Sequence, residues 1–292
     1  MILLAHLSDA HIGPIPRPRL RELMGKRATG YANWLHKRSR QHDMELLGRL
    51  VDDLLAQRPD HIALTGDIVN IGLPAEIAEA VAWLRRLGPP ERVSFSPGNH
   101  DAYTPGAMPA LAEAFAPWTT GDDGSKDFPY LRRRGGVALI GLSSGIPTSP
   151  FVASGRLGSR QRADLVALLE RTGAEGLARV VLLHHPPHRG GARPFRGLDD
   201  AADFEAVIAR CGAELVLHGH NHLRSLHMLP APGGSTPVVG AASASARPKA
   251  HGPGASYNLF EVARDGARVR IAARARGFDA AGKLVDLEPF AL

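Results

Sequence analysis

Apolar and polar positions along the chain fall into two recurring patterns, one typical of buried strands and one typical of amphipathic helices. Short apolar runs predict strands at residues 2–8, 61–65, 92–96, 128–132, 137–143, 179–183 and 214–217. Apolar residues at helical spacing predict helices at residues 43–57, 74–87, 106–115, 159–171 and 199–210. Ser159 is the expected N-cap of the helix that it opens. Strands and helices therefore alternate, which indicates an α/β fold.

The pattern changes after Leu223, where strands follow one another without helices between them. These predicted strands lie at residues 225–229, 237–241, 256–262 and 268–275. No obvious linker separates this β-rich part, residues 225–292, from the rest of the chain. We therefore expect a single domain over residues 1–292, in which β-sheets pack together and helices cover them.

Metal-capable side chains follow five of the predicted strands, at the point where each strand ends. The set consists of Asp9, His11, Asp67, Asn99, His100, Asp101, His184, His185, His220 and His222. Ligands bind at the carboxyl ends of strands in open α/β sheets, so we expect these side chains to converge. Single Asp and Asn residues also favour turns for local reasons, but turn chemistry is an improbable explanation of the whole set.

The residue types in this set predict a pair of metal ions. Asp9 and His11 are two residues apart, and on extended backbone such a pair points to one side. The same spacing relates His220 and His222, while Asp67 offers a carboxylate that can bridge two cations. The donors are oxygen and nitrogen without thiolate, which suits two divalent or trivalent ions of Mn, Fe, Zn or Co.

Two such ions suit the hydrolysis of a phosphate ester. Cations about 3.5–4 Å apart can hold a bridging hydroxide and clamp the phosphoryl oxygens. We expect His100, which follows Asn99, to serve the leaving oxygen or the developing charge. Asp101 either orients His100 or caps the following segment. Glycines before Asp67, Asn99 and His220 would let the backbone approach the ions closely.

Together these motifs resemble the calcineurin-like metallophosphoesterase superfamily over about residues 1–225. The motifs are Asp9-x-His11, Gly66-Asp67, Gly98-Asn99-His100-Asp101, His184 and Gly219-His220-Asn221-His222. The resemblance implies a four-layer αββα sandwich, with two mixed β-sheets face to face and helices outside. It implies one metal ion on Asp9, His11, Asp67 and His222, and a second on Asp67, Asn99, His184 and His220. It also implies that His100 contacts the substrate.

The chain length and the motif that begins His184-His185 are similar to those of bacterial cyclic-nucleotide phosphodiesterases and glycerophosphodiesterase-like members of this superfamily. We therefore expect a phosphodiesterase that acts on a small phosphodiester or pyrophosphate. His185 is expected to contact substrate, with two alternatives: it only packs, or it replaces His184 as a ligand. Three alternatives stay open: a lipid-linked nucleotide pyrophosphatase at a membrane surface, a nuclease, and a non-catalytic scaffold, against which the complete ligand set argues.

An insertion, residues 13–42, follows the first motif directly and is rich in basic and aromatic residues. Its basic side chains are Arg17, Arg19, Arg21, Lys26, Arg27, Lys37, Arg38 and Arg40. One interpretation is a solvated helical pair on the rim. The other is a basic cap, residues 14–42, that binds an anionic lipid headgroup or a membrane surface, with nucleic acid a less favoured partner. A second rim loop offers Arg193 and Arg196 to the substrate.

The bulk composition adds to this picture in a few respects. A formal net charge of +6 favours anionic partners without choosing among them. Cys211 is the single cysteine, so the fold does not need an internal disulfide. The first apolar run is short and lacks a basic region before it, and no run of about 18 apolar residues occurs. We expect a cytoplasmic location, with peripheral attachment to a membrane left open and no oligomeric state indicated.

Overall fold

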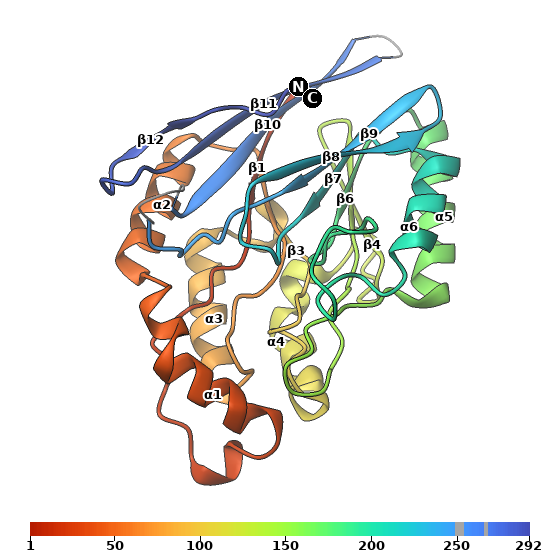
Figure 1. Cartoon of the computed structure of the whole chain (residues 1–292). Coiled ribbons are helices and arrows are strands. Elements are labelled where there is room, and N and C mark those ends of the chain that lie inside the picture. Colours follow the sequence, from red (N-terminus) through yellow and green to blue (C-terminus); the bar gives the residue numbers. More distant parts are fainter. Residues whose placement is uncertain (249–253, 266–267) are drawn as a thin grey trace.

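Two six-stranded β-sheets lie face to face at the centre of the computed structural model, which describes residues 1–248, 254–265 and 268–292 (Figure 1). The first sheet has the strand order β12 (Leu284–Leu287), β11 (Arg268–Phe278), β10 (Ser256–Asp265), β1 (Ile2–Leu7), β2 (His61–Leu64) and β3 (Val93–Phe95). The second has the order β4 (Tyr130–Arg134), β5 (Val137–Gly141), β6 (Ala178–Leu182), β7 (Leu215–His218), β9 (Gly234–Gly240) and β8 (Ser225–Ala231). Both sheets combine parallel and antiparallel neighbours, as expected.

Helices cover the outer faces of both sheets. The first sheet is covered by α2 (Met44–Ala56), α3 (Pro74–Leu87) and α4 (Met108–Thr119), and the second by α5 (Gly158–Ala174) and α6 (Ala201–Cys211). The remaining helix, α1 (Lys26–His36), lies in the insertion at one end of the molecule (Figure 1). The layer order confirms the predicted four-layer sandwich. No helix in the described ranges is both long enough and apolar enough to cross a bilayer.

The continuous apolar runs are explained by burial on both sides of each sheet. Leu4 of β1 lies in the core between the sheets, while its neighbour Ala5 faces the helices. Val180 and Leu182 of β6 likewise lie between the sheets, and Val181 faces α5 and α6. Because side chains alternate along a strand, such double burial requires an apolar residue at nearly every position.

The strands after Leu223 complete both sheets. β8 and β9 extend the second sheet, where β9 runs parallel to β7. β10 joins the first sheet as the antiparallel neighbour of β1, over Ile2–His6. β12 was not predicted, because it is a four-residue strand at the edge of the sheet, where β11 is its pairing partner among the described strands.

The start of α5 differs from the prediction. The helix begins at Gly158, so Ser159 lies inside the first turn and does not cap it. The carboxylate of Asp200 accepts hydrogen bonds from the backbone N–H groups of Leu157, at 3.0 Å, and Gly158, at 2.8 Å. The carboxylate of Asp200, at the N-terminal boundary of α6, thus satisfies backbone donors at the start of α5.

Asp53 ties α2 to the β10–β11 hairpin. Its carboxylate accepts hydrogen bonds from Nε and Nη2 of Arg276, at 2.7 and 2.9 Å, and from the hydroxyl of Tyr257, at 2.5 Å. Partial burial alone would raise the pKa of Asp53, but the hydrogen bonds from Arg276 and Tyr257 outweigh it and lower that pKa. The ionised carboxylate therefore stabilises the fold.

We predict that Asp53→Asn lowers the free energy of unfolding by about 1–2 kcal/mol at neutral pH. A depressed folded-state pKa contributes stability that is present above the unfolded-state pKa, near 4, and is lost as pH falls through the folded-state pKa. Urea unfolding at a series of pH values should show the gap between variant and parent narrowing toward acid. Asp52→Asn, at an exposed neighbour, is the control and should cost less than about 0.5 kcal/mol. A gap that does not change with pH would contradict this account.

Candidate metal centre

The loops after β1, β2, β3, β6 and β7 meet at one end of the two sheets. The backbone N–H of Asp9 donates to the carbonyl of Gly66 at 2.9 Å, which joins the first two loops. Nδ1 of His184 lies 2.6 Å from the carbonyl oxygen of Thr65, so the second sheet is tied to the first. Gly219 N–H donates to the carbonyl of His184 at 3.0 Å. Both sheets therefore contribute to one site.

Four of the predicted ligands form a first donor cluster, made by Asp9, His11, Asp67 and His222. Nε2 of His222 lies 3.1 Å from Oδ1 of Asp9 and 3.2 Å from Nε2 of His11. The same nitrogen of His11 lies 3.8 Å from Oδ1 of Asp9 and 3.8 Å from Oδ2 of Asp67. Oδ1 of Asp9 is buried and accepts no hydrogen bond within the described part of the chain.

A second donor cluster consists of Asp67, Asn99, His184 and His220. Oδ1 of Asn99 lies 2.9 Å from Nδ1 of His220 and 3.2 Å from Nε2 of His184. These two imidazole nitrogens are themselves 3.2 Å apart. Nε2 of His184 also lies 3.2 Å from Oδ2 of Asp67. Oδ2 of Asp67 is therefore common to both clusters.

The donor atoms in both clusters fit the environment of transition-metal ions. A carbonyl oxygen can only accept, so Nδ1 of His184 carries the proton that it donates to Thr65, and in the neutral ring Nε2 has the lone pair that a metal ion would bind. Two nitrogens bound at about 2.0–2.1 Å to one tetrahedral ion lie roughly 3.3–3.4 Å apart. Facing lone pairs at 2.9 to 3.2 Å repel unless a cation or a proton lies between them.

Five of the seven predicted ligands adopt a left-handed backbone conformation. They are Asp9, His11, Asp67, His220 and His222, with φ between 41° and 70°. Only Arg58, Phe151 and Phe195 share this feature among the other non-glycine residues that the structure describes. Such backbone costs free energy and clusters at functional sites. The finding corrects the assumption that the paired ligands lie on extended backbone.

Glycine is required at two positions where the loops of the site approach each other. A Cβ on Gly98 would collide with the Asp67 carboxylate and would lie 2.8 Å from the His184 ring. A Cβ on Gly66 would lie 2.5 Å from Nδ1 of His184, and its φ of +96° also disfavours other residues. These glycines precede Asp67 and Asn99 and allow close packing of the ligand loops.

His100 lies beside both clusters and contacts Arg38 of the insertion. Its backbone N–H donates to Oδ1 of Asp67 at 2.7 Å. Its Nδ1 lies against the carbonyl oxygen of Asn70, so Nδ1 carries the ring proton. Its Nε2 accepts a hydrogen bond from Nη1 of Arg38 at 2.8 Å. Burial and the nearby guanidinium lower the pKa of His100 to about 3, so the ring is neutral at pH 7.

Arg38 was predicted only as one of the basic residues of the insertion. Its Nη2 lies 3.2 Å from Nε2 of His11, so the guanidinium reaches from His100 to a member of the first donor cluster. The insertion carries this side chain in a single-turn 3₁₀ helix, Arg38–Arg40, that follows α1. The insertion is therefore one helix and short turns, in place of a helical pair, and it takes part in the site.

Asp101 lies beneath the site and holds its loops. Its carboxylate accepts hydrogen bonds from the backbone N–H groups of Asp67, at 2.6 Å, Gly98, at 2.8 Å, and Ile68, at 3.0 Å. Burial and the neighbouring Asp67 raise the pKa of Asp101 to about 7. The described hydrogen bonds do not connect this side chain to the ring of His100. The described contacts match neither of the two predicted roles, because these donors precede Asp101 in the chain, and the carboxylate instead holds the loops after β2 and β3 together.

His185 is fully buried, and both of its ring nitrogens have protein partners. Nδ1 lies 2.8 Å from Oγ of Ser144, and Nε2 lies 3.2 Å from the carbonyl oxygen of Ala153. Neither nitrogen is left for a metal ion or a substrate. In this structure the imidazole packs behind the pocket over the site, where its partner Ala153 forms part of the wall.

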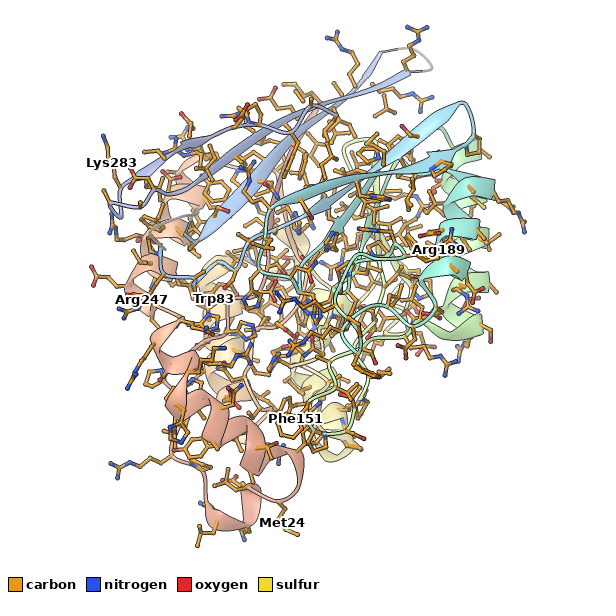
Figure 2. The ribbon with its side chains drawn as sticks, viewed as in Figure 1. Met24, Trp83, Phe151, Arg189, Arg247 and Lys283 are labelled. Carbon is orange, nitrogen blue, oxygen red and sulfur yellow. The ribbon has the colours of Figure 1, made fainter. Side chains whose placement is uncertain are left out.

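A pocket of about 450 Å³ opens over the two clusters. Its walls carry the cations Lys26, Lys37, Arg38 and Arg196 and the side chain of Phe151, which is 87 % exposed. None of these four cations forms an ion pair with a carboxylate within the described ranges. Arg193 lines an adjoining hollow with Arg196 and His220. Figure 2 shows Phe151 at the same end of the molecule as Met24 of the insertion.

Comparison with known proteins gives a family match, a relative in sequence and solved structures of similar fold. A family model described as calcineurin-like phosphoesterase matches residues 2–224. A probable cyclic nucleotide phosphodiesterase from Synechococcus is 29 % identical over 179 residues, which span 58 % of this chain and 60 % of that relative's length.

Two solved structures share the fold at low sequence identity. A dimetal phosphatase from Danio rerio has a TM-score of 0.64 at 14 % identity and covers 94 % of this chain and 96 % of its own. A purple acid phosphatase from yellow lupin seeds has a TM-score of 0.53 at 11 % identity and covers 98 % of this chain and 52 % of its own.

Proposed function

Because the chain belongs to the calcineurin-like phosphoesterase family, we propose that it hydrolyses phosphodiester bonds with a dinuclear metal centre. The observation that carries the proposal is the pair of donor clusters that share Oδ2 of Asp67 and open into one pocket. The two ions would be held by Asp9, His11, Asp67 and His222 and by Asp67, Asn99, His184 and His220. When bound, such a pair polarises phosphoryl oxygens and lowers the pKa of water so that it attacks phosphorus near neutral pH.

The chain's own residues provide orientation and charge. The hydrogen bond from His184 to the Thr65 carbonyl fixes its tautomer, as partners of metal-binding histidines commonly do. A phosphoryl group that enters between His100 and Arg38 receives N–H donors from the guanidinium. Its negative charge also favours the protonated form of His100, which can then donate a proton to the leaving oxygen.

Measuring hydrolysis before and after metal removal tests the proposal. The chelator-treated protein should not cleave bis(p-nitrophenyl) phosphate, and added Mn²⁺ should restore cleavage with about two equivalents bound. Less than one equivalent of metal, with no hydrolysis in added Mn²⁺, would favour the scaffold alternative. Cleavage of single-stranded nucleic acid with a steep salt dependence would instead favour a nuclease.

Arg38 is proposed to bind the phosphoryl oxygens. We predict that Arg38→Ala lowers kcat/KM for bis(p-nitrophenyl) phosphate by about 10²–10³-fold, as loss of one donor to a developing charge does in other enzymes. Both metal ions should stay bound, because the side chain is not a ligand. Arg40→Ala, an exposed arginine in the same turn, is the control. A loss below threefold in Arg38→Ala would contradict this role.

A second candidate function is the hydrolysis of a pyrophosphate that links a nucleotide to a lipid. The four cations of the pocket favour a substrate with more negative charge than one phosphodiester carries. Leu20 and Met24 of the insertion, 90 % and 76 % exposed, lie among basic residues, which suits an anionic membrane surface. Cyclic nucleotides, glycerophosphodiesters and nucleotide-diphosphate lipids should be compared on metal-loaded protein. Preference for the last, with co-sedimentation on anionic vesicles, would favour this candidate.

A further inference from the structure

His42, the last residue of the insertion, lies beside the first donor cluster although no sequence motif includes it. Backbone hydrogen bonds fix its position on both sides. The N–H of Asp43 donates to the carbonyl of Ser245 at 2.8 Å, and the N–H of Arg247 donates to the carbonyl of Gln41 at 3.0 Å. The segment before α2 is thus paired with the segment after β9, and the imidazole has a defined place.

The two ring nitrogens of His42 have different surroundings. Nδ1 lies 2.7 Å from Oγ of Ser245. Nε2 is buried and has no hydrogen-bond partner in the part of the chain that the structure describes. A buried polar atom without a hydrogen-bond partner destabilises the folded chain. Such an atom in a native fold points to a partner outside the protein, such as a water molecule or an ion.

Two predicted ligands face the same ring. The ring centroid of His42 lies 4.7 Å from that of His11 and 5.8 Å from that of His222. One ring nitrogen from each of these three residues lies within 4.8 Å of the other two. His11 and His222 both belong to the first donor cluster, so the imidazole of His42 lies next to the position proposed for one metal ion.

We propose that His42 supplies a further ligand nitrogen, Nε2, to the metal ion held by Asp9, His11, Asp67 and His222. The proposal rests on the dinuclear centre of the proposed function. Ser245 would orient the imidazole through its other nitrogen, in the way that outer partners orient metal-bound histidines. A third imidazole would tighten this position and favour ions with a preference for nitrogen, such as Zn²⁺ and Co²⁺, over Mg²⁺.

His61 provides a matched control within the same chain. It is also buried, its Nε2 lies 2.8 Å from Oγ of Ser94, and its Nδ1 has no hydrogen-bond partner within the described residues. It lies at the amino end of β2, whereas the metal-capable loops follow the carboxyl ends of the strands. His61→Gln therefore removes an equivalent buried group without touching the site.

The test is a Co²⁺ titration of the metal-free full chain, followed by visible absorption and competition with a chelator. The parent should bind two ions. His42→Gln should lower the affinity for one of these ions by about 10–100-fold and change the visible absorption of that ion. The affinity for the other ion should stay the same. His61→Gln should keep both affinities. Ser245→Ala leaves the imidazole in place and should lower the affinity for the same ion by a smaller factor. It replaces His42→Gln as the test if that variant does not fold.

Unchanged affinities and spectra in His42→Gln and Ser245→Ala would overturn the proposal. A structural role alone would lower the thermal stability of His42→Gln and His61→Gln and leave Co²⁺ binding intact in both. If the parent itself bound no Co²⁺, the proposed dinuclear centre would fail together with this inference. If the parent bound two ions and His42→Gln bound them equally well, only the inference would fail.

Discussion

Asp67→Ala is expected to lose both metal ions and to lower kcat/KM by more than about a thousandfold. The reason is geometric, because one oxygen atom serves both donor clusters. Oδ2 of Asp67 lies 3.8 Å from Nε2 of His11 in the first cluster and 3.2 Å from Nε2 of His184 in the second. Elemental analysis after dialysis, together with hydrolysis of bis(p-nitrophenyl) phosphate, measures both effects.

Two controls separate metal loss from damage to the fold. Asp52→Ala removes an exposed carboxylate and should keep two equivalents of metal and full activity. Circular dichroism should show that Asp67→Ala is folded, although it loses the hydrogen bond that His100 N–H donates to Oδ1 of Asp67. Two equivalents of metal in folded Asp67→Ala would contradict the shared-ligand role.

His100→Ala is expected to keep both metal ions and to lower kcat by about 10²–10⁴-fold for substrates with poor leaving groups. The ring belongs to neither donor cluster. Its Nδ1 is engaged by the Asn70 carbonyl, and its Nε2 faces Arg38 in the pocket. A group that protonates the leaving oxygen matters most when that oxygen is basic. Rates on a series of aryl phosphodiesters, plotted against the pKa of the leaving phenol, measure this dependence.

Tyr103→Phe is the control for His100→Ala. The two rings are stacked, with centroids 5.5 Å apart, so this variant keeps the packing and the imidazole. It should retain the leaving-group dependence of the parent. If His100→Ala lost activity equally on good and poor leaving groups, stabilisation of charge would be its only role. Loss of metal from His100→Ala would contradict its placement outside the clusters.

The sequence predicted the layers and the convergence of the metal-capable side chains for a clear physical reason. Doubly buried strands need nearly continuous apolar runs, and the residue that ends each run can be read directly. The backbone conformation of the ligands could not be predicted in the same way. The left-handed conformations of Asp9 and His11 are supported by contacts between loops, such as the hydrogen bond from Asp9 N–H to Gly66, and not by the local sequence.

Adjacency in sequence also does not fix where a side chain points. Asp101 and His185 follow predicted site residues directly, yet both are buried and bond to backbone or loop atoms beneath the pocket. Arg38 and His42 lie in an insertion whose path depends on tertiary contacts, such as the bond from Asp43 N–H to Ser245. Their proximity to His11 therefore required the folded chain.

Anomalous diffraction from crystals of the Mn²⁺-loaded protein tests the central claim most directly. The account predicts two peaks about 3.5–4 Å apart, one on each side of the Asp67 carboxylate. Asp9, His11 and His222 should surround one peak, and Asn99, His184 and His220 the other. A single peak, or metal bound away from these side chains, would contradict the dinuclear centre.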